Sequence, residues 1–369
     1  MKTPRLFGTD GIRGHFGEFP LDRPTVTALA VELAATLQER ANGSVPEVVL
    51  GGDTRESTPE ICGWLAQGLE AGGVRVRYAG VIPTPGVAWL IKPLGAAAGV
   101  VVSASHNPWP DNGIKLLDPS GCKWRDEDEH ALERRLLSSA APPPIPPSPF
   151  ELATEEPLRK KYLDHLASTL DEPLDGLKVV LDTGNGAASS YAAEIFERLG
   201  ARVTLLHAEP DGRNVNEGCG STAPGEMAAR VVAEGAHLGA AFDGDADRCI
   251  LADERGEVRD GDAILYLWAL SLRDRGLLDP PRIVATTMSN LGLERALDRE
   301  GIGIVRCAVG DRYVVEAMKK EGILLGGEQS GHIVQMELAS TGDGLLTAVQ
   351  MAKVLKDSGC PLSELLAPF

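Results

Sequence analysis

The sequence predicts an α/β protein built from three consecutive domains of related topology, and two observations lead to this prediction. An apolar strand, a helical stretch, a glycine and a second apolar strand follow one another three times, in segments 48–78, 178–206 and 282–305. Strand, helix and strand at this spacing form a parallel βαβ unit with a right-handed crossover. The glycine after each helix suits the left-handed conformation in which many helices end.

The first predicted domain opens with a helix over Thr25–Glu39, whose apolar residues form one stripe that packs into a core: Val26, Leu29, Ala30, Leu33 and Leu37. Its βαβ unit is expected to comprise a strand, a helix and a strand, at Val48–Leu50, Thr58–Ala71 and Val74–Tyr78. Thr58 has the hydroxyl of a helix cap and Pro59 suits the first helical position.

The second and third units repeat this order. The second is expected at Lys178–Asp182, Ala187–Leu199 and Val203–Leu206, and the third at Arg282–Thr287, Leu291–Arg299 and Ile302–Val305. A helix over Asp126–Leu137 is followed by the proline-rich run Ala141–Pro149, which we interpret as a stiff linker. A second domain boundary, less sharply marked in the sequence, is expected near Asp253–Gly261. The predicted domains are therefore 1–148, 149–253 and 254–369.

Composition and charge exclude some classes of function. The 369 residues contain 36 Lys and Arg against 53 Asp and Glu, a net charge of −17, which disfavours a general binder of nucleic acid or of anionic membranes. A local basic pocket for a small anion remains compatible with this charge. No apolar run approaches the ~20 residues of a membrane helix. The N-terminus lacks the apolar region of a signal peptide, and the six cysteines form no CxxC pair, so we expect reduced thiols and a cytoplasmic location.

The segment Phe242–Arg248 (FDGDADR) is the sharpest local signal. Asp243, Asp245 and Asp247 stand at alternate positions after an apolar strand. Regular extension would place all three carboxylates on one face, and a loop would also bring them together. Because like charges repel, such a group favours a hard cation, Mg²⁺ or Ca²⁺. An EF-hand is excluded, since its sixth position is Arg248 instead of glycine. The alternative is a solvated acidic turn.

The segment Ser103–Lys115 (SASHNPWPDNGIK) follows another small apolar strand and is rich in turn formers. A rigid loop at a strand end presents a hydroxyl well, and Ser105 is the candidate nucleophile. His106 is expected to point away from it, because the two residues are adjacent in sequence. Lys115 is a candidate donor to an anion. The alternative is a proline-rich turn with a buried histidine.

Two further segments are glycine-flanked. In Phe7–Gly14 (FGTDGIRG), the glycines let backbone amides approach an anion and Arg13 adds a planar donor, although this pattern alone is weak. In Gly326–His332 (GGEQSGH), alternate polar residues suit sugar hydroxyls, and the alternative is a hairpin turn. These residues are Glu328, Ser330 and His332, and Gly310–Tyr313 (GDRY) is a lesser candidate for the same pocket.

Taken together and in this order, the four motifs resemble the α-D-phosphohexomutase family over all 369 residues. FGTDGIRG, VGDRYV and the glutamine of GEQSGH resemble the bacterial branch that acts on glucosamine phosphates. The resemblance implies topologically alike α/β domains with mixed sheets flanked by helices. It also implies interconversion of glucosamine 6-phosphate and glucosamine 1-phosphate, feeding UDP-N-acetylglucosamine and cell-wall synthesis.

The resemblance also implies a role for each motif. Ser105 would carry a transferable phosphoryl group, and a phosphoserine oxygen would bind Mg²⁺ together with the three aspartates. Arg13, Lys115 and Arg248 would steady the phosphoryl group, and His106 or Lys115 would transfer the proton. Glucosamine 1,6-bisphosphate would be the intermediate and activator. The sugar would bind the following residues: Glu328, Ser330, His332, Asp311, Arg312 and Arg248. A homodimer through the first domain is a further expectation.

The sequence departs from the family pattern in two ways. Ala246 stands where the family commonly has glycine. The fourth domain of the family, with its loop that grips the distal phosphate, is expected to be missing, so weak turnover is predicted. Three alternatives are a glucose or mannose phosphate specificity, a non-catalytic phosphosugar-binding protein and a Mg²⁺-dependent phosphatase.

Overall fold

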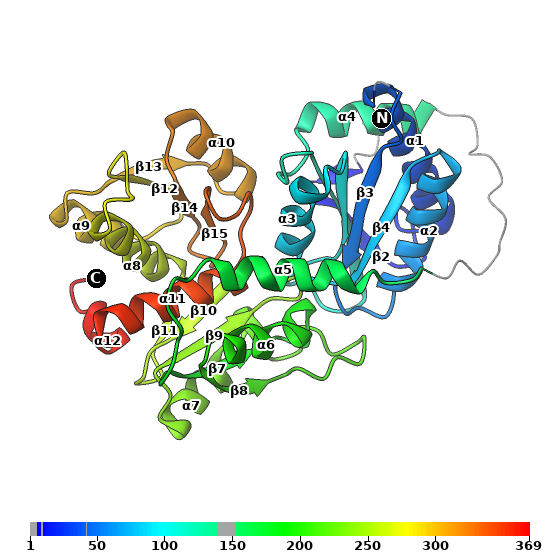
Figure 1. Ribbon diagram of the computed structural model, residues 1–369. Helices are drawn as coiled ribbons and strands as arrows, with labels where there is room; N and C mark the ends of the chain where they lie inside the picture. The colour runs from blue at the N-terminus through cyan, green and yellow to red at the C-terminus, as the bar shows by residue number, and fades with distance from the viewer. Residues whose placement is uncertain (1–5, 9, 42, 139–151) are drawn as a thin grey trace. The chain divides into compact units, whose positions relative to one another are not determined.

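The computed structural model describes residues 6–8, 10–41, 43–138 and 152–369, so the predicted linker Ala141–Pro149 lies outside the described residues. Two compact units are present (Figure 1). Unit 1 holds the described residues up to Tyr162 together with Asp211–Val215, and unit 2 holds Leu163–Pro210 and Asn216–Phe369. Helix α5 (Glu156–Ser168) begins in unit 1 and ends in unit 2.

Unit 1 contains a mixed six-stranded sheet in the order β1-β2-β6-β5-β3-β4. The strands are β1 (Phe7–Gly8), β2 (Gly11–His15), β3 (Glu47–Gly52), β4 (Arg75–Val81), β5 (Ala98–Val102) and β6 (Asp111–Leu117). Strand β3 runs parallel to β4 and β5, whereas β6 is antiparallel to β5 and β2. The helices are α1 (Arg23–Arg40), α2 (Thr58–Ala71), α3 (Thr84–Leu94) and α4 (Asp126–Ser138).

Helices cover both faces of this sheet. Helix α1 packs along α2, and the predicted stripe on α1 is buried in a core that also takes Val48, Leu50 and Val100 from the sheet. Helix α3 packs on β3 and β5 from the opposite side (Figure 1). The capping prediction for α2 was wrong: Ser57 is the capping residue by position and Thr58 is already helical. The Thr58 hydroxyl instead donates to Asp53 Oδ1 at 3.0 Å.

The first sheet of unit 2 has the order β11-β10-β9-β7-β8. Its strands are β7 (Lys178–Asp182), β8 (Arg202–Leu206), β9 (Leu238–Phe242), β10 (Cys249–Ala252) and β11 (Val258–Arg259). Helix α7 (Gly225–Glu234) packs on one face, and α6 (Ala192–Arg198) covers β8. Short 3-10 turns precede these helices at Ala187–Ser190 (η1) and Gly220–Thr222 (η2). The predicted helix Ala187–Leu199 is therefore split between η1 and α6.

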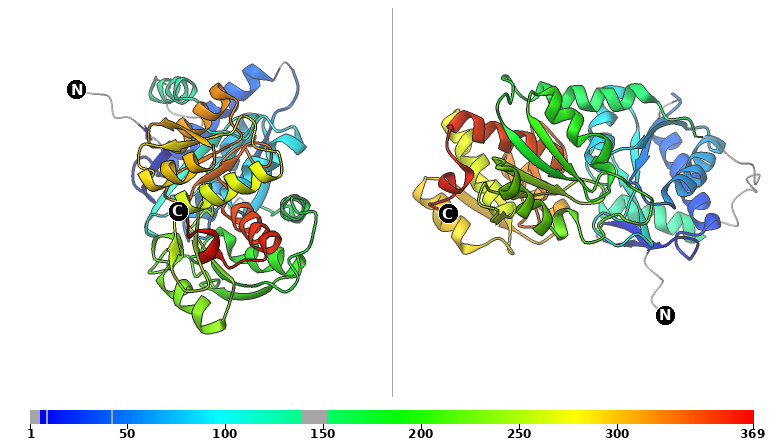
Figure 2. Two further views of the ribbon diagram at one scale, coloured as in Figure 1. Left: turned by 90° about the vertical axis from the view of Figure 1, so that its left-hand side faces the viewer. Right: turned by 90° about the horizontal axis from the view of Figure 1, so that it is seen from below.

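The second sheet of unit 2 has the order β13-β12-β14-β15. Its strands are β12 (Arg282–Thr286), β13 (Gly303–Cys307), β14 (Leu325–Gly327) and β15 (Ile333–Gln335). The accompanying helices are α8 (Gly261–Asp274), α9 (Leu291–Arg299), α10 (Asp311–Glu321), α11 (Gly344–Ser358) and α12 (Leu362–Leu365). Helix α11 contacts both α8 and strands β9 and β10, and Figure 2 shows it in red beside the yellow α8.

The three sheets share one topology. In each, a first strand (β3, β7 or β12) lies between two parallel neighbours, and the later neighbour pairs antiparallel with a fourth strand. The α/β class with mixed sheets and related topology is thus confirmed, and the positions of the domain boundaries stay predictions. The three motifs SASHNP, DGDADR and GEQSGH all occupy the connection from the third strand to the fourth.

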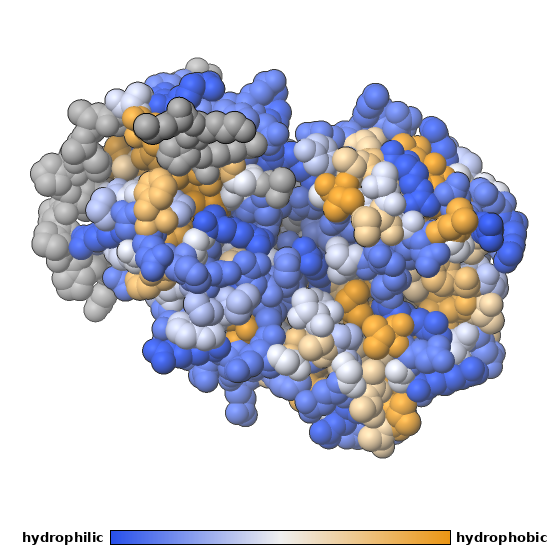
Figure 3. Space-filling model, turned by 180° about the vertical axis from the view of Figure 1, so that it is seen from behind, coloured by the Kyte–Doolittle hydropathy of each residue, from blue (hydrophilic) through white to orange (hydrophobic). Residues whose placement is uncertain are grey.

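The described part of the chain contains no helix with the length and apolar composition needed to cross a membrane. On the face drawn in Figure 3, the coloured hydrophobic residues form small patches separated by hydrophilic ones.

Candidate active site

The loop between β5 and β6 holds Ser105 in a constrained conformation. Ser105 adopts a positive φ of 51° and is only 1% exposed. Its backbone N–H donates to Ser103 Oγ at 2.9 Å, and Ser103 Oγ donates in turn to Asp53 Oδ2 at 2.5 Å. His106 Nδ1 lies 3.4 Å from Ser105 Oγ, so His106 does not point away as expected. The neighbouring imidazole is within reach of a proton on the candidate nucleophile.

The buried Arg55 guanidinium organises this loop. Its Nη1 pairs with Asp53 Oδ2 at 2.5 Å, and neither side chain is exposed. Its Nη2 donates to the carbonyl oxygens of Ser105 at 3.2 Å and of Asn107 at 2.5 Å, and its Nε donates to that of Asp111 at 2.7 Å. A planar guanidinium satisfies several fixed acceptors at once, which an ammonium cannot do. Arg55 therefore fixes the loop from Ser105 to Asp111.

Basic side chains gather around Asp10 in the same unit. Asp10 forms ion pairs with Arg13 and Lys123, and Lys115 Nζ lies 3.6 Å from its Oδ2. Burial opposes ionisation of Asp10, but Lys115, Lys123 and Arg13 hold its pKa well below the usual value. Three cationic side chains therefore surround this one carboxylate. Arg13 and Lys115, both predicted site residues, are thus brought together at a place suited to a phosphoryl group.

Two strands of the segment Phe7–Gly14, β1 and β2, pair antiparallel. Gly8 and Gly11 are paired across β1 and β2. Gly11 has a φ of 79°, and a β-carbon there would clash with the carbonyl oxygen of Ile114 on β6. The requirement for glycine at this position comes from the close approach of β2 and β6.

The three aspartates of unit 2 converge. Asp243, Asp245 and Asp247 are buried and present carboxylate oxygens that all lie within 4.8 Å of one another. Convergence depends on a tight turn after β9, in which the Ala246 N–H donates to the carbonyl oxygen of Asp243 at 3.0 Å. Ala246 adopts a φ of 54° within this turn. A solvated acidic turn does not describe this buried group.

Arg248 supplies part of the counter-charge. Its Nε lies 4.0 Å from Asp243 Oδ2 and 3.8 Å from Asp247 Oδ1. Burial opposes the charge on Arg248, yet the three aspartates and Glu328 raise its pKa. Three buried carboxylates this close to one another favour a bound cation.

The loop between β14 and β15 lies against the aspartate turn within unit 2, because the Cys249 N–H donates to the carbonyl oxygen of Gly331 at 3.0 Å. Glu328 Oε1 accepts from the Gly310 N–H at 2.9 Å, at the start of α10. His332 is 2% exposed, and its Nε2 accepts from the Gly342 N–H at 3.2 Å.

The other candidate sugar-binding residues lie around the start of α10. Asp311 Oδ2 is 3.7 Å from His332 Nε2, and Asp311 Oδ1 accepts from the Arg312 N–H at 2.7 Å. Ser330 is exposed, whereas Glu328 is half-buried. Although Glu328, Ser330 and His332 alternate in sequence, their side chains therefore differ in solvent exposure.

Comparisons with known proteins agree with these motifs. Family models described as phosphoglucomutase/phosphomannomutase, alpha/beta/alpha domains I, II and III, match residues 4–142, 160–256 and 260–369. A phosphoglucosamine mutase of Solibacter usitatus is 47% identical over 98% of this chain and 80% of its own length. The chain belongs to the phosphoglucomutase/phosphomannomutase family. A phosphoglucosamine mutase of Symbiobacterium thermophilum is 48% identical, over 98% of this chain and 81% of its own.

The fold of this phosphohexomutase also matches a solved structure. A putative phosphomannomutase from Thermus thermophilus superposes with a TM-score of 0.85 at 26% identity, covering 99% of this chain and 83% of the other. The predicted family and fold are confirmed.

Magnesium, which this family uses, fits the aspartate group. The group offers oxygen ligands only, holds them within 4.8 Å and buries them. A small hard cation prefers such carboxylate oxygens. Asp243, Asp245 and Asp247 are therefore the residues that would hold Mg²⁺ in this phosphohexomutase.

Sequence reasoning missed four residues of the site: Asp10, Asp53, Arg55 and Lys123. Asp53 and Arg55 directly follow β3, in the sequence GGDTRES, and polar residues after a parallel strand are a usable signal. Asp10 and Lys123 are 113 residues apart in sequence, and no local sequence pattern predicts that they pair.

Proposed function

We propose that this phosphohexomutase is a phosphoglucosamine mutase that interconverts glucosamine 6-phosphate and glucosamine 1-phosphate. The observation that carries the proposal is the identity of almost half the residues, over 98% of the chain, with relatives that bear this name. The product would feed UDP-N-acetylglucosamine and cell-wall synthesis in the cytoplasm.

The reaction begins with a phosphoryl group on Ser105. The oxygen on C1 of glucosamine 6-phosphate attacks phosphorus, the bond from phosphorus to Ser105 Oγ breaks, and the hydroxyl proton passes through His106 or Lys115 to the departing Ser105 Oγ. The product of this half is glucosamine 1,6-bisphosphate. The short distance from His106 Nδ1 to Ser105 Oγ, 3.4 Å, supports a proton-transfer role for this imidazole.

The second half returns a phosphoryl group to the serine. Ser105 Oγ attacks the 6-phosphoryl group of the reoriented bisphosphate, the bond from phosphorus to the oxygen on C6 breaks, and that oxygen regains a proton. Glucosamine 1-phosphate leaves. Arg13 and Lys115 steady the phosphoryl group in unit 1, and Arg248 does so in unit 2. Bound Mg²⁺ would neutralise phosphoryl charge, and its predicted phosphoserine ligand stays a prediction.

The sugar would be held by residues of the loop between β14 and β15 and of the start of α10: Glu328, Ser330, His332, Asp311 and Arg312. Glu328 accepts a backbone N–H and His332 is fixed by Gly342, so both are preorganised to bind hydroxyl groups. A homodimer through the first domain is part of the same proposal.

Ser105→Ala tests the role of the nucleophile. The protein is incubated with glucosamine 1,6-bisphosphate and Mg²⁺, and intact mass reports phosphorylation while ³¹P NMR reports isomer formation. We expect the wild-type chain to gain one phosphoryl group and S105A to gain none, with transfer at least about a thousandfold slower. Ser44→Ala, at an exposed serine remote from the loop, is the matched control. Equal phosphorylation of S105A and S44A would refute the assignment.

Parallel assays with glucosamine, glucose and mannose 6-phosphates test the specificity. We expect kcat/KM to be greatest for the amino sugar. A higher value for glucose or mannose would assign that hexose specificity, and release of inorganic phosphate would indicate a phosphatase. Binding without any phosphoryl transfer would indicate a non-catalytic phosphosugar-binding protein.

A further inference from the structure

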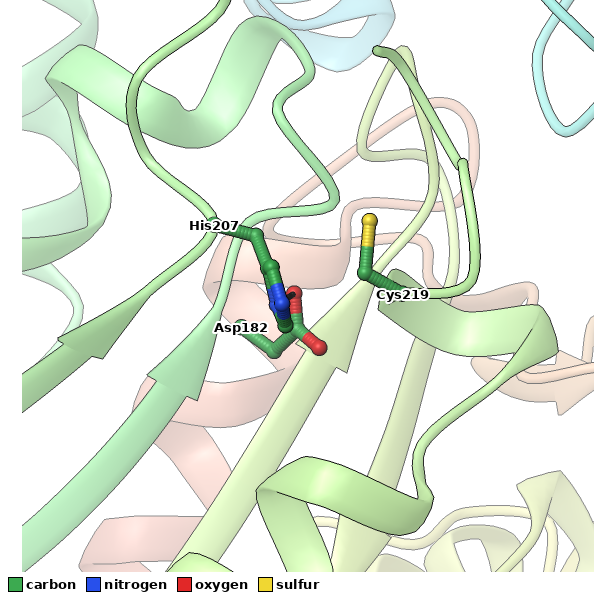
Figure 4. A group of neighbouring side chains, drawn as sticks. All are labelled: Asp182, His207 and Cys219. Atoms are coloured by element: carbon green, nitrogen blue, oxygen red, sulfur yellow. Dashed lines mark ion pairs between the residues drawn. The ribbon is translucent and has the colours of Figure 1, made fainter.

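A second group of metal-ligating side chains lies in unit 2, apart from the three aspartates. Asp182 ends β7, His207 follows β8, and Cys219 precedes η2 (Figure 4). One ligand atom from each lies within 4.8 Å of the others. The carboxyl ends of parallel strands commonly bind ligands. None of the three residues takes part in the proposed mutase reaction.

Asp182 is held rigidly. It is fully buried, with Oδ1 accepting from the Gly184 N–H at 2.9 Å and Oδ2 accepting from the Gly220 N–H at 3.0 Å. Each carboxylate oxygen has two lone pairs, so both keep acceptor capacity for a cation. The backbone thus aims a preorganised carboxylate at His207.

The contact between His207 and Asp182 lacks a hydrogen bond. His207 Nδ1 lies 3.1 Å from Asp182 Oδ1, but among the described residues this buried nitrogen has no partner in hydrogen-bonding geometry. The other ring nitrogen, Nε2, lies 3.4 Å from Glu226 Oε2. A proton on Nε2 facing Glu226 leaves the Nδ1 lone pair directed at a carboxylate oxygen. Two such acceptors repel unless a cation lies between them.

The Cys219 thiol adds a third donor in a negative environment. Its side chain is fully buried and lies near the carboxylates of Asp182, Glu217 and Glu226. The same carboxylates that disfavour a bare thiolate favour a divalent cation, and coordination would release the thiol proton.

We propose that Asp182, His207 and Cys219 bind a Zn²⁺ ion. One oxygen, one nitrogen and one sulfur ligand match the preference of this borderline-soft ion, whereas Mg²⁺ and Ca²⁺ prefer oxygen alone. The N···O separation of 3.1 Å between His207 Nδ1 and Asp182 Oδ1 is close to the roughly 3.3 Å between tetrahedral ligands of zinc. Glu226 on the far ring nitrogen supplies the carboxylate–histidine–metal arrangement that orients such ligands.

This site would brace the aspartate turn. The Ala187 N–H, just after the Asp182 loop, donates to the carbonyl oxygen of Gly244 at 2.8 Å. A β-carbon at Gly220, next to Cys219, would clash with the carbonyl oxygen of Phe242. The loops that bind zinc therefore pack directly against the start of the turn that carries Asp243.

Titration of the chelator-stripped full chain with ZnCl₂ tests the proposal. Excess Mg²⁺ occupies the aspartate group, and calorimetry measures stoichiometry and affinity. We expect one Zn²⁺ per chain, with affinity at least about tenfold weaker in Cys219→Ser and in His207→Gln. Cys360→Ser, which removes an exposed thiol, and Asp245→Asn, which alters the other cluster, should leave the zinc affinity unchanged.

Cobalt provides a measurement that does not depend on variants. Co²⁺ bound to the wild-type chain should show a thiolate-to-metal charge-transfer band that Zn²⁺ displaces. Absence of this band, or zinc affinity equal in wild type and C219S, would overturn the site and leave His207 and Asp182 as a simple ion pair. Neither readout requires mutase activity, so failure here is distinguishable from failure of the proposed function.

Discussion

At the scale of single residues, Arg55 is a positioning residue for the serine loop. It donates to the carbonyl oxygens of Ser105 and Asn107 and neutralises Asp53, which also accepts from Ser103. The backbone around Ser105 is held at a positive φ, a conformation that costs about 1–2 kcal/mol for an L residue and must be imposed by its neighbours. Arg55 supplies that constraint.

Arg55→Lys should slow phosphorylation of Ser105 at least tenfold and lower the free energy of unfolding of unit 1 by about 3 kcal/mol, because an ammonium cannot satisfy all the buried acceptors. Intact mass follows phosphorylation and urea unfolding gives stability. Arg40→Lys is the control. The Arg40 side chain is half-exposed and pairs with Asp128 at 2.8 Å, so this substitution should change the free energy of unfolding by less than about 1 kcal/mol. Unchanged phosphorylation in folded R55K would contradict the positioning role.

The backbone conformation at Ala246, with a φ of 54°, explains why the family commonly has glycine at this position of the aspartate turn. Ala246→Gly should therefore raise the free energy of unfolding by roughly 0.5–1 kcal/mol in urea. Ala240→Gly, at a fully buried alanine of the neighbouring strand β9, is the matched control and should destabilise by about 1 kcal/mol or more. Destabilisation by both substitutions would show that the turn carries no strain at Ala246.

At the scale of elements, each of the three sheets carries its candidate functional motif in the same connection between strands. Each motif follows the third strand of its sheet, where a parallel strand ends and the chain turns into an antiparallel partner. The turns are short in the second and third sheets, so side chains that alternate in sequence are brought together by backbone reversal. Strand extension does not hold the aspartates together.

Helix α11 begins directly against the aspartate turn. Asp343 caps it by accepting from the Leu346 N–H at 2.9 Å, and the Gly344 N–H donates to the carbonyl oxygen of Ala246 at 2.9 Å. A β-carbon at Gly344 would clash with the carbonyl oxygen of Arg248. Close contact between this helix and the turn therefore requires glycine.

Gly344→Ala should displace the turn and weaken Mg²⁺ binding at least tenfold in calorimetric titration. Gly63→Ala on α2, where a β-carbon meets nothing within 4 Å, is the control. It should leave Mg²⁺ affinity unchanged and stabilise its helix by about 1 kcal/mol. Equal Mg²⁺ affinity in the two variants would show that the contact between α11 and the aspartate turn does not affect metal binding.

At the scale of the whole molecule, local patterns predicted the elements and long-range pairing decided the site. The bounds of α2, α9 and β7 agree with the sequence prediction to the residue, because glycines and apolar runs are local signals. The pairing of β2 with β6 was missed because it joins segments that are distant in sequence. The misplaced cap at Thr58 has the same origin, since Asp53 and Asn112 bind its hydroxyl.

The charge clusters follow the same rule. The three aspartates are neighbours in sequence and were predicted as a group, whereas Asp10 with Lys123 and Arg55 with Asn107 join distant segments. A sequence pattern of period two or 3.6 carries no information on such pairs. Topology supplies it, because it fixes which loops meet at one edge of a sheet.

Two units with separate cores should respond separately to ligands. Mg²⁺ at a hundred times its dissociation constant should stabilise unit 2 by about 2.7 kcal/mol and leave unit 1 unchanged, because the three aspartates belong to unit 2 alone. Hydrogen exchange resolved by residue, with and without a chelator, measures each unit independently. Asp245→Asn should abolish the protection of unit 2 by Mg²⁺. R55K should destabilise unit 1 and leave the Mg²⁺ protection of unit 2 unchanged. Equal Mg²⁺ protection of both units would show that they unfold as one body.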